Sequence, residues 1–334
     1  MKPFRSILIT GGAGFIGSHF TRLAVRSHPG ARVTVLDKLT YAGNRANLAG
    51  LGGAIRFVRG DICDAALVAR LFKGLDAVVH FAAETHVDRS LGRSADFLRT
   101  NVLGTHTLLE AARRAPGLRF VHVSTDEVYG SRARGAFREG DPLNPSSPYS
   151  ASKASSDLLA LSYVTTWGLN LSVTRCTNNY GPNQHPEKLI PLFVTNLEEG
   201  KQVPVYGSGR NRRDWIFVED HCRAVDLVLR RGGAGEVYNV AGGQEKDNLA
   251  VTRAILKAMG LGRDRIRFVE DRPGHDWRYA ISDAKVRALG FKPRESFASG
   301  LARTVAWYRA NAAWWRPVKA GDFQSYYRKQ YRQR

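Results

Sequence analysis

The sequence predicts an α/β fold: a Rossmann-type, doubly wound parallel sheet with a smaller, mixed C-terminal lobe. The first observation is that short β-branched runs alternate with helical patterns through the first half of the chain. The second is a glycine-rich turn that directly follows the first of these runs. The strand-like runs cover residues 7–10, 32–36, 77–81, 120–124, 171–175 and 236–240, and helix-like stretches cover 14–26 and 97–114. This alternation favours parallel strands with helices on both faces and a ligand at the carboxyl ends of the strands.

The pattern loosens from about Gly181, where proline, glycine and aromatic residues become more frequent. We therefore expect a Rossmann domain of residues 1–181 plus about 213–244. The remaining segments, 182–212 and 245–334, are expected to form a substrate-binding lobe. The cleft between the two would hold a second ligand.

The composition is that of an ordinary globular protein, with 43% hydrophobic and 24% charged residues. The formal net charge of +20 favours anionic partners in general, such as a nucleotide diphosphate, nucleic acid or an acidic membrane surface. The charge is spread along the chain, so we interpret it as a basic surface and expect no nucleic-acid partner. Aromatics interleave with cations at 326–334, which could touch nucleic acid but is expected to be a docked or frayed end.

Cysteine spacing and hydropathy exclude several other classes of protein. Cys63, Cys176 and Cys222 lie far apart, with neither metal-ligand nor disulfide spacing, so we expect no metal site. This usage suits a reducing cytoplasm. The apolar run near the N-terminus is too short for a signal core, and no run approaches the ~20 residues of a membrane span. We expect a cytoplasmic protein without a membrane partner.

The glycine-rich turn predicts a dinucleotide site. Gly11, Gly14 and Gly17 give the spacing GxxGxxG at the end of the first strand, where glycine allows a tight turn and close approach of the backbone to a pyrophosphate. The N-terminus of the following helix, which includes Phe15 and Ile16, supplies donors and partial positive charge.

Asp37 indicates which dinucleotide binds. It ends the second strand, where a carboxylate can accept both ribose hydroxyls and repel a 2′-phosphate, so NAD is favoured over NADP. The neighbouring Lys38 leaves some room for NADP. The other residues expected at this site follow strand ends or lie nearby: Leu39, Thr40, Asp61, Ile62, Phe81, Ala82, Ala83, Thr85, Thr100 and Asn179.

A tyrosine and a lysine at helical spacing predict a catalytic base. Ser147 can cap a helix whose first residue is Pro148. Residues four apart share a face, so the Tyr149 phenol and the Lys153 ammonium can converge on one site. A nearby cation favours the phenolate, which can take a proton from a hydroxyl group. The alternative is a surface Tyr and Lys at chance helical spacing.

Two adjacent carboxyl groups follow the strand at 120–124. Burial of Asp126 and Glu127 next to Thr125 is costly unless both face a cleft, where one can act as an acid and the other as a base. The alternative is a polar turn that caps a helix.

These residues belong to longer segments that resemble the dTDP-glucose 4,6-dehydratases, a family of the extended short-chain dehydrogenase/reductase superfamily, over nearly the whole chain. The matching segments are GGAGFIGSHF from Gly11, LDKLTYAGNRANL from Leu36, HFAAETHVDRS from His80, VSTDEVYGS from Val123, PYSASKASSD from Pro148, RCTNNYGPNQHPEKLIPLFV from Arg175, RDWIFVEDH from Arg213 and DRPGHDWRYA from Asp271. The glycine and tyrosine motifs are shared across the superfamily, whereas the TDE, EKLIP and RPGHD segments are more specific. Thr85 stands where the family usually has serine.

The resemblance implies a mechanism and its residues. Tyr149, assisted by Lys153 and Thr125, takes the C4 hydroxyl proton as a hydride passes to NAD⁺. Glu127 then removes the C5 proton while Asp126 protonates the departing C6 hydroxyl. The hydride returns to C6, which leaves a 4-keto-6-deoxy sugar with no net redox. The pKa of Asp126 must be raised for this role, and burial beside Glu127 would raise it.

The resemblance also implies a substrate site, mainly in the smaller lobe, and a homodimer. The residues concerned are Thr85, Thr125, Asn178, Glu187, Lys188, Leu189, Pro204, Tyr206, Arg213, Asn248, Arg272 and His275. His86 and His185 are interpreted as structural. The dimer would pair helices of roughly residues 95–114 and 149–167, whose apolar faces could instead pack within one chain.

Other functions remain open to the sequence. A sugar 4-epimerase needs only Tyr149 and Lys153, and a nucleotide-glucuronate decarboxylase or GDP-mannose dehydratase typically lacks the aspartate at Asp126. A related 4,6-dehydratase could use UDP- or CDP-glucose. A non-catalytic nucleic-acid-binding module would have no reason to keep the catalytic residues together.

Overall fold

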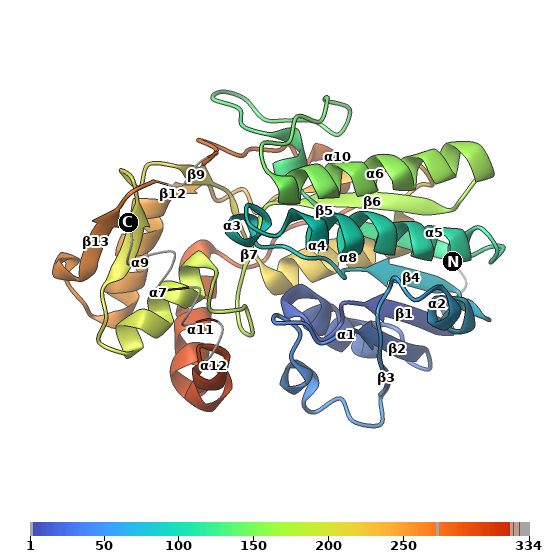
Figure 1. Cartoon of the computed structure of the whole chain (residues 1–334), viewed down its shortest axis with the longest axis horizontal. Coiled ribbons are helices and arrows are strands. Elements are labelled where there is room, and N and C mark those ends of the chain that lie inside the picture. Colours follow the sequence, from blue (N-terminus) through green and yellow to red (C-terminus); the bar gives the residue numbers. More distant parts are fainter. Residues whose placement is uncertain (1–2, 272–273, 321–322, 324–326, 328–334) are drawn as a thin grey trace.

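The computed structural model describes residues 3–271, 274–320, 323 and 327. Its centre is a seven-stranded sheet in the order β11-β6-β5-β4-β1-β2-β3, in which every pairing is parallel (Figure 1). The strands are β1 (Ser6–Thr10), β2 (Arg32–Asp37), β3 (Ile55–Arg59), β4 (Ala77–His80), β5 (Arg119–Thr125), β6 (Leu171–Cys176) and β11 (Val237–Val240). The order reverses between β1 and β4, as in a doubly wound sheet, so the predicted fold class is confirmed.

Helices cover both faces of this sheet because successive side chains of a strand point in opposite directions. Ile9 and Val79 face a core on the side of α1 (Phe15–Ser27), α8 (Val218–Arg231) and α10 (Ala284–Ala288). Leu8 and Val78 face a second core on the side of α2 (Ala65–Phe72), α5 (Thr105–Ala112) and α6 (Pro148–Trp167). Burial on both faces explains why the strands appear in the sequence as nearly continuous apolar runs.

Short helical turns follow several strands. They are η1 (Arg45–Leu48), α3 (Val87–Ser90), α4 (Ser94–Phe97), the π-helical turn η2 (Leu98–Gly104) and η3 (Asp126–Tyr129). The helix expected at 97–114 is therefore three consecutive pieces, α4, η2 and α5, and it ends at Ala112. The expected strand 77–81 ends at His80, and 236–240 begins at Val237.

A second group of elements lies beside the sheet, at the left of Figure 1, and is called the peripheral group here. It comprises α7 (Leu189–Glu198), β8 (Val203–Tyr206), α9 (Asn248–Met259), η4 (Arg263–Arg265), β13 (Ile266–Val269), α11 (Phe297–Ala310) and α12 (Ala312–Val318). It has its own apolar core, which includes Phe193, Ile255, Tyr308 and Trp315. Two small sheets join it to the rest: β7 (Asn178–Tyr180) with β10 (Trp215–Phe217), and β9 (Arg212–Arg213) with β12 (Lys246–Asp247).

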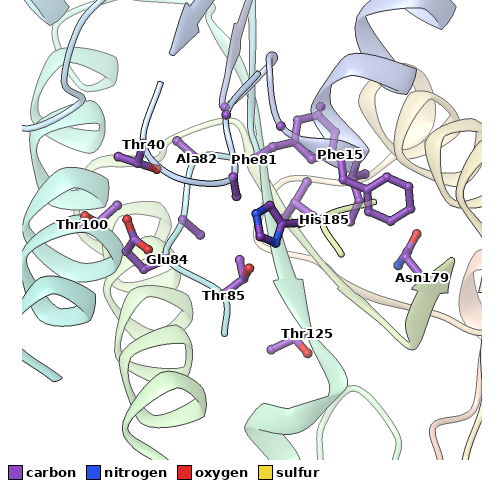
Figure 2. Close-up of a pocket in the computed structure, with 18 of the residues that line it drawn as sticks. Phe15, Thr40, Phe81, Ala82, Glu84, Thr85, Thr100, Thr125, Asn179 and His185 are labelled. Carbon is purple, nitrogen blue, oxygen red and sulfur yellow. The ribbon is translucent and has the colours of Figure 1, made fainter. Parts of the chain in front are cut away.

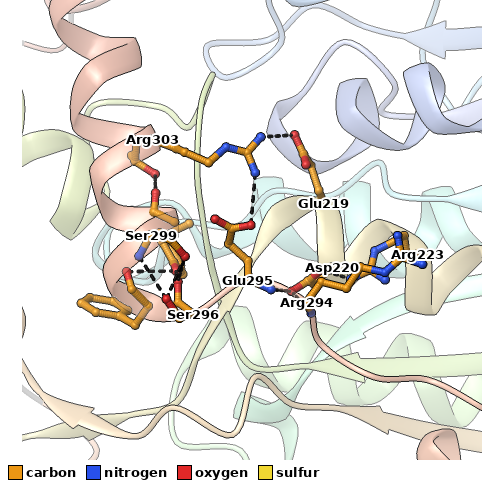
Figure 3. Close-up of polar contacts among 12 residues, drawn as sticks. Glu219, Asp220, Arg223, Arg294, Glu295, Ser296, Ser299 and Arg303 are labelled. Carbon is orange, nitrogen blue, oxygen red and sulfur yellow. Dashed lines mark hydrogen bonds and ion pairs between the residues drawn. The ribbon is translucent and has the colours of Figure 1, made fainter.

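Polar contacts fix α11 to α8. Arg303 on α11 pairs with Glu219 at 2.9 Å and with Glu295 at 3.4 Å (Figure 3). The Asp220 carboxylate accepts the backbone amides of Arg294 and Glu295, each at 2.9 Å, just before α11 begins. The peripheral group is thereby anchored to a helix that packs directly on the sheet.

None of the helices in the described ranges combines the length and apolar character that a membrane crossing requires. Across the same ranges, no three His, Cys, Asp or Glu side chains are grouped so as to hold a metal ion. The three cysteines are free thiols.

The turn between β1 and α1 is packed too tightly for side chains. Gly11 has a φ of +69°, and a Cβ there would lie 2.6 Å from the amide nitrogen of Ala82. A Cβ on Gly17 would lie 2.2 Å from the Gly11 carbonyl oxygen. Because both neighbours are backbone, only glycine fits at these positions.

Gly17→Ala should therefore lower the free energy of unfolding by about 1–3 kcal/mol, since the backbone must shift to admit the methyl group. Gly52→Ala is the matched control, because an added Cβ there meets no heavy atom within 4 Å, and it should change stability by less than about 0.5 kcal/mol. Urea unfolding of both variants measures the difference. Equal stabilities would contradict the packing argument.

Candidate active site

A cavity of about 280 Å³ opens at the carboxyl ends of the central strands. Its lining comes from the turn after β1, the ends of β2 and β5, the loop after β4, the start of α6 and the segment 176–188. Figure 2 shows Phe15, Thr40, Thr85, Thr125 and Asn179 around this cavity, although they come from separate helices, strands and loops. This is where a doubly wound sheet is expected to bind its ligand.

The glycine turn forms one wall. Gly11, Gly14 and Gly17 all line the cavity, and Gly14 is the N-cap residue of α1. Because Gly14 has no side chain, the first amide groups of α1 stay open toward the cavity at the positive end of the helix. Such an N-terminus is suited to a diphosphate.

The carboxylate of Asp37 stands next to this turn. It accepts the amides of Ala13 at 2.9 Å and Leu39 at 2.8 Å, which leaves lone pairs on both oxygens for ribose hydroxyls. Burial raises the pKa of Asp37, and the amide hydrogen bonds oppose this shift. Lys38 pairs with Asp61 at 2.7 Å, so its ammonium is already matched by a carboxylate.

The other residues expected at the cofactor end line the cavity with one exception. Those that do are Phe15, Ile16, Lys38, Thr40, Asp61, Ile62, Phe81, Ala82, Ala83, Thr85, Thr100, Tyr149, Lys153 and Asn179. Leu39 does not line it. Its backbone adopts a φ of +57°, and its side chain packs against an apolar cluster that includes Val35 and Leu48.

The acidic pair lies at the inner end of the cavity. Asp126 is only 3% exposed, its Oδ1 accepts a hydrogen bond from Thr125 at 3.3 Å, and its Oδ2 has no partner among the described residues. Burial, followed by the charge of Glu127, raises the pKa of Asp126 well above its usual range, while Arg213 opposes the shift. The raised pKa favours the neutral form of the Asp126 carboxyl, in the direction expected from the sequence.

Tyr149 approaches the same point from α6. Ser147 caps this helix through the Ser150 amide at 3.1 Å, and Pro148 is its first residue, as the sequence predicts. Tyr149 and Lys153 are both buried and both line the cavity. The Thr125 side chain is close enough to the Tyr149 hydroxyl to act on its pKa, so the end of β5 and the start of α6 meet in the cavity.

The electrostatic environment of Tyr149 differs from the sequence-based expectation that a nearby cation favours the phenolate. Burial, followed by the charge of Glu127, raises the pKa of Tyr149 well above its usual range. The Lys153 ammonium donates to the Val123 carbonyl at 2.9 Å, and burial lowers its pKa to about 8. Lys153 therefore does not outweigh burial and the acidic pair. A further positive charge in the cavity is needed to favour the phenolate.

A buried network holds η3 against α6. Arg175 on β6 donates to Asp157 of α6 at 2.8 Å and to the Tyr129 hydroxyl of η3 at 2.7 Å. Tyr129 in turn donates to Asn239 at 2.9 Å. The network fixes the acidic pair relative to Tyr149, because Tyr129 ends the turn that Asp126 begins.

Five of the residues expected to bind the substrate line the cavity: Thr85, Thr125, Asn178, Glu187 and Lys188. Lys188 donates to the Thr85 carbonyl at 2.9 Å, and Glu187 pairs with Arg89 at 2.9 Å. Burial would raise the pKa of Glu187, but its cationic neighbours outweigh it and lower this pKa to about 2. These contacts join the segments 85–89 and 187–188, which are distant in sequence, at the cavity wall.

The other expected substrate residues that the structure describes do not line this cavity. Leu189 packs on the peripheral core, and Pro204 belongs to β8. The ring centroids of Tyr206 and His275 are 6.0 Å apart, and His275 Nδ1 forms a hydrogen bond with Asp271 Oδ1 at 2.6 Å.

Arg213 and Asn248 lie near the same sheet, β9–β12. The Arg213 guanidinium donates to the Asp276 carbonyl at 2.9 Å and lies over the Tyr279 ring at 4.2 Å. The backbone amide of Asn248 donates to the backbone carbonyl of Asn211 at 3.1 Å. Arg272 lies outside the described residues.

The structure adds residues that the sequence analysis did not select. Tyr279 is buried, stacks on Arg213 and is close enough to Glu127 for that charge to raise its pKa. The sequence feature that could have identified Tyr279 is its place in the DRPGHDWRYA segment, which resembles the dehydratase family. His185, interpreted as structural, lines the cavity and also bonds the Glu187 amide at 3.3 Å. Further lining residues are Leu36, Ala42, Gly43, Gly60, Glu84, Val123, Ser124, Cys176, Thr177 and Gln184.

The family model described as GDP-mannose 4,6 dehydratase matches residues 8–304. The dTDP-glucose 4,6-dehydratase of Streptomyces niveus is 59% identical over 323 residues, which cover 95% of this chain and 96% of the relative. That of Mycobacterium tuberculosis is 51% identical over 318 residues, covering 94% and 96%.

The chain belongs to the dTDP-glucose 4,6-dehydratase family.

Solved structures agree with this family assignment. The family member DesIV from Streptomyces venezuelae, solved with NAD bound, superposes with a TM-score of 0.92 at 55% identity and covers 94% of this chain and 100% of that one. The UDP-glucose 4-epimerase of Thermus thermophilus, also solved with NAD, reaches 0.85 at 31% identity and covers 92% and 99%. As in the wider superfamily, this dehydratase family uses NAD. The glycine turn, the open N-terminus of α1 and the Asp37 carboxylate fit that cofactor.

The raised pKa of Asp126 has a consequence for stability. The folded protein holds a proton on Asp126 that the unfolded chain releases above about pH 4. Stability therefore falls as pH rises from about 4 toward the raised folded pKa. Asp126→Asn removes this titration, so the melting temperature of the variant should rise relative to that of the wild type as the pH increases above about 4.

Thermal melts across this pH range test the point. Asp264→Asn is the control, because its carboxylate is 75% exposed, and its difference from the wild type should stay constant. A pH-independent difference for Asp126→Asn would show that Asp126 is not held protonated.

Proposed function

We propose that this chain is an NAD-dependent dTDP-glucose 4,6-dehydratase, a hydro-lyase that forms dTDP-4-keto-6-deoxyglucose and water. The acidic pair is the observation that supports this proposal best. A buried Asp126 with a raised pKa lies beside Glu127 and close to Tyr149, and all three line the cavity expected to bind the dinucleotide. An elimination needs an acid for the leaving group and a base for the proton.

Tyr149 begins the reaction by taking the proton of the C4 hydroxyl. When bound, NAD⁺ supplies a hydride acceptor for C4, a hydride donor for C6 and the positive charge that the phenol requires. Thr125 lies next to the phenol, and its hydroxyl would hydrogen-bond the C4 hydroxyl of the sugar. The buried Lys153 supports the phenolate by its charge.

The acidic pair performs the elimination. The C4 ketone acidifies C5–H, Glu127 takes that proton, and the C–H electron pair forms the C5–C6 double bond as the C6–O bond breaks. Asp126 gives its proton to the departing oxygen, so water leaves rather than hydroxide. Glu127 returns a proton to C5 when the hydride reaches C6, and the overall change is the loss of one water.

We also propose that the segments 182–212 and 245–334 form the nucleotide-sugar-binding lobe. They contain the peripheral group, and of the second segment α10 packs on the central sheet instead. Asn178 would contact the sugar diphosphate, and the segment beginning at Glu187 would hold the nucleotide. Tyr206 and His275 lie against each other there, which supports a shared role. Arg213 suits the diphosphate because its planar fork matches phosphate oxygens, and its charge already reaches Asp126.

Incubation with dTDP-glucose and no added reductant tests the function. The expected result is a product with the alkali-induced absorbance of a 4-keto-6-deoxy sugar, lighter by one water and without accumulating NADH. Asp126→Asn should lower product formation by about 10²–10⁴-fold while C4 oxidation stays measurable as bound NADH.

Other outcomes would correct the proposal in different places. An isomer of unchanged mass would identify an epimerase and remove the acidic pair from the mechanism. Turnover of UDP- or CDP-glucose alone would keep the mechanism and change the nucleotide. Normal turnover by Asp126→Asn would exclude Asp126 as the acid.

We further propose that the protein is a cytoplasmic homodimer. Support comes from a run of exposed large apolar side chains on η2, α6 and the turns around α3: Leu91, Leu98, Leu103, Leu158 and Trp167. The helices α5 and α6 lie side by side on one face in Figure 1. Because η2 and α3 both pack against α6, these side chains come from neighbouring elements, and exposed apolar surface favours an interaction site. The free thiols suit a reducing compartment.

Leu158→Glu should shift the protein from dimer to monomer in light scattering coupled to gel filtration, because it places a charge in this apolar surface. The control is Phe268→Glu, which changes a side chain of similar exposure (57% against 59%) on β13. A monomeric wild type, or a Leu158→Glu variant that stays dimeric, would contradict the proposed interface.

A further inference from the structure

Helix α12 is joined to the residues beside the glycine turn through the Trp314 side chain. The Trp314 indole Nε1 donates to Asn47 Oδ1 at 2.9 Å, across 267 positions of sequence. The same oxygen accepts Asn183 Nδ2 at 3.1 Å, and Asn47 Nδ2 donates to the Ala13 carbonyl at 2.9 Å. An indole N–H only donates and a carbonyl only accepts, so the Asn47 amide has one possible orientation.

Ala13 connects this contact to the cofactor site. It lies between Gly11 and Gly17, its carbonyl also accepts the Asn44 amide at 3.0 Å, and its amide donates to Asp37 at 2.9 Å. Asn47 is 1% exposed, so its hydrogen bonds are not shared with bulk water. Trp314, Asn47, Ala13 and Asp37 therefore form a continuous chain of contacts from α12 to the expected ribose carboxylate.

A second cavity, also of about 280 Å³, lies beside the same contact. Trp314, Pro317 and Val318 of α12 line it together with Asn183 and the segment 41–44. It shares Ala42, Gly43 and His185 with the cofactor cavity. These shared residues stand between α12 and the cofactor, so movement of α12 would free one wall of the cofactor site.

The neighbouring indole faces the other way. Trp315 is 1% exposed and donates to the Tyr308 carbonyl of α11 at 2.8 Å, which holds α12 within the peripheral group. The chain turns between α11 and α12 at Asn311, and α11 is independently anchored to α8 (Figure 3). The position of α12 against the glycine turn thus depends on Trp314, and its attachment to α11 depends on Trp315.

We propose that Trp314 and Asn47 act as a clasp that holds α12 against the NAD-binding turn and slows the dissociation of NAD. The chemistry gives this retention a purpose: hydride leaves C4 and returns to C6, so the cofactor ends each cycle in its starting state and need not exchange. The clasp concerns cofactor binding, and it goes beyond the proposed sugar chemistry.

The test compares two adjacent indoles. Trp314→Phe and Trp315→Phe each remove one indole N–H hydrogen bond from α12 and keep an aromatic ring. The enzyme is loaded with NADH and mixed with excess NAD⁺ in a stopped-flow instrument, and the loss of bound NADH fluorescence gives the dissociation rate. Trp314→Phe should release NADH about threefold to tenfold faster, the effect of losing one hydrogen bond. Trp315→Phe should lower the melting temperature and leave the release rate unchanged.

Asn183→Gly provides a second variant. Asn183 has a φ of +65°, which glycine adopts without strain, so this change removes only the other donor to Asn47. Asn183→Gly should also accelerate the release of NADH, and it tests the clasp by itself if Trp314→Phe does not fold. Release at the wild-type rate from both clasp variants, or equal acceleration by Trp315→Phe, overturns the proposal. No sugar is present, so an error in the proposed substrate leaves this result unaffected.

Discussion

The common direction of the seven central strands is the constraint on which the rest of this protein depends. Because all of them run parallel, their carboxyl ends meet at one edge of the sheet. The glycine turn and the acidic pair follow β1 and β5 there, Asp37 and Cys176 end β2 and β6, and all of them line one cavity. An antiparallel strand in place of any of these would carry its functional group to the opposite edge.

Burial of charge then decides how the groups in that cavity behave. Asp126 and Glu127 are adjacent in sequence, yet Asp126 is buried and its pKa is raised, whereas Glu127 is partly exposed. The same burial raises the pKa of Tyr149, which disfavours the phenolate. Acid and base roles in this site therefore follow from solvent exclusion as well as from residue type.

Two sets of contacts keep these groups in register. The Arg175 network joins η3 to α6 from beneath the cavity, and it is buried, so its ion pair with Asp157 is little screened by solvent. The contacts of α11 and α12 with α8 and η1 join the peripheral group to the cofactor turn from outside. A reaction that oxidises and then reduces the same sugar requires both sets, because cofactor and substrate must stay aligned through several steps.

Much of this site is local and was determined by the sequence alone. The strand periodicity, the glycine spacing, the capped helix that carries Tyr149 and Lys153, and the acidic pair at a strand end each depend on residues within a few positions of one another. Leu39 shows where adjacency fails, since its backbone conformation turns the side chain into an apolar cluster. Only the tertiary structure decided the near-complete burial of Asp126, the Arg213–Tyr279 contact and the Trp314–Asn47 hydrogen bond. These arise from burial and from residues up to hundreds of positions apart, which no local pattern in the chain encodes.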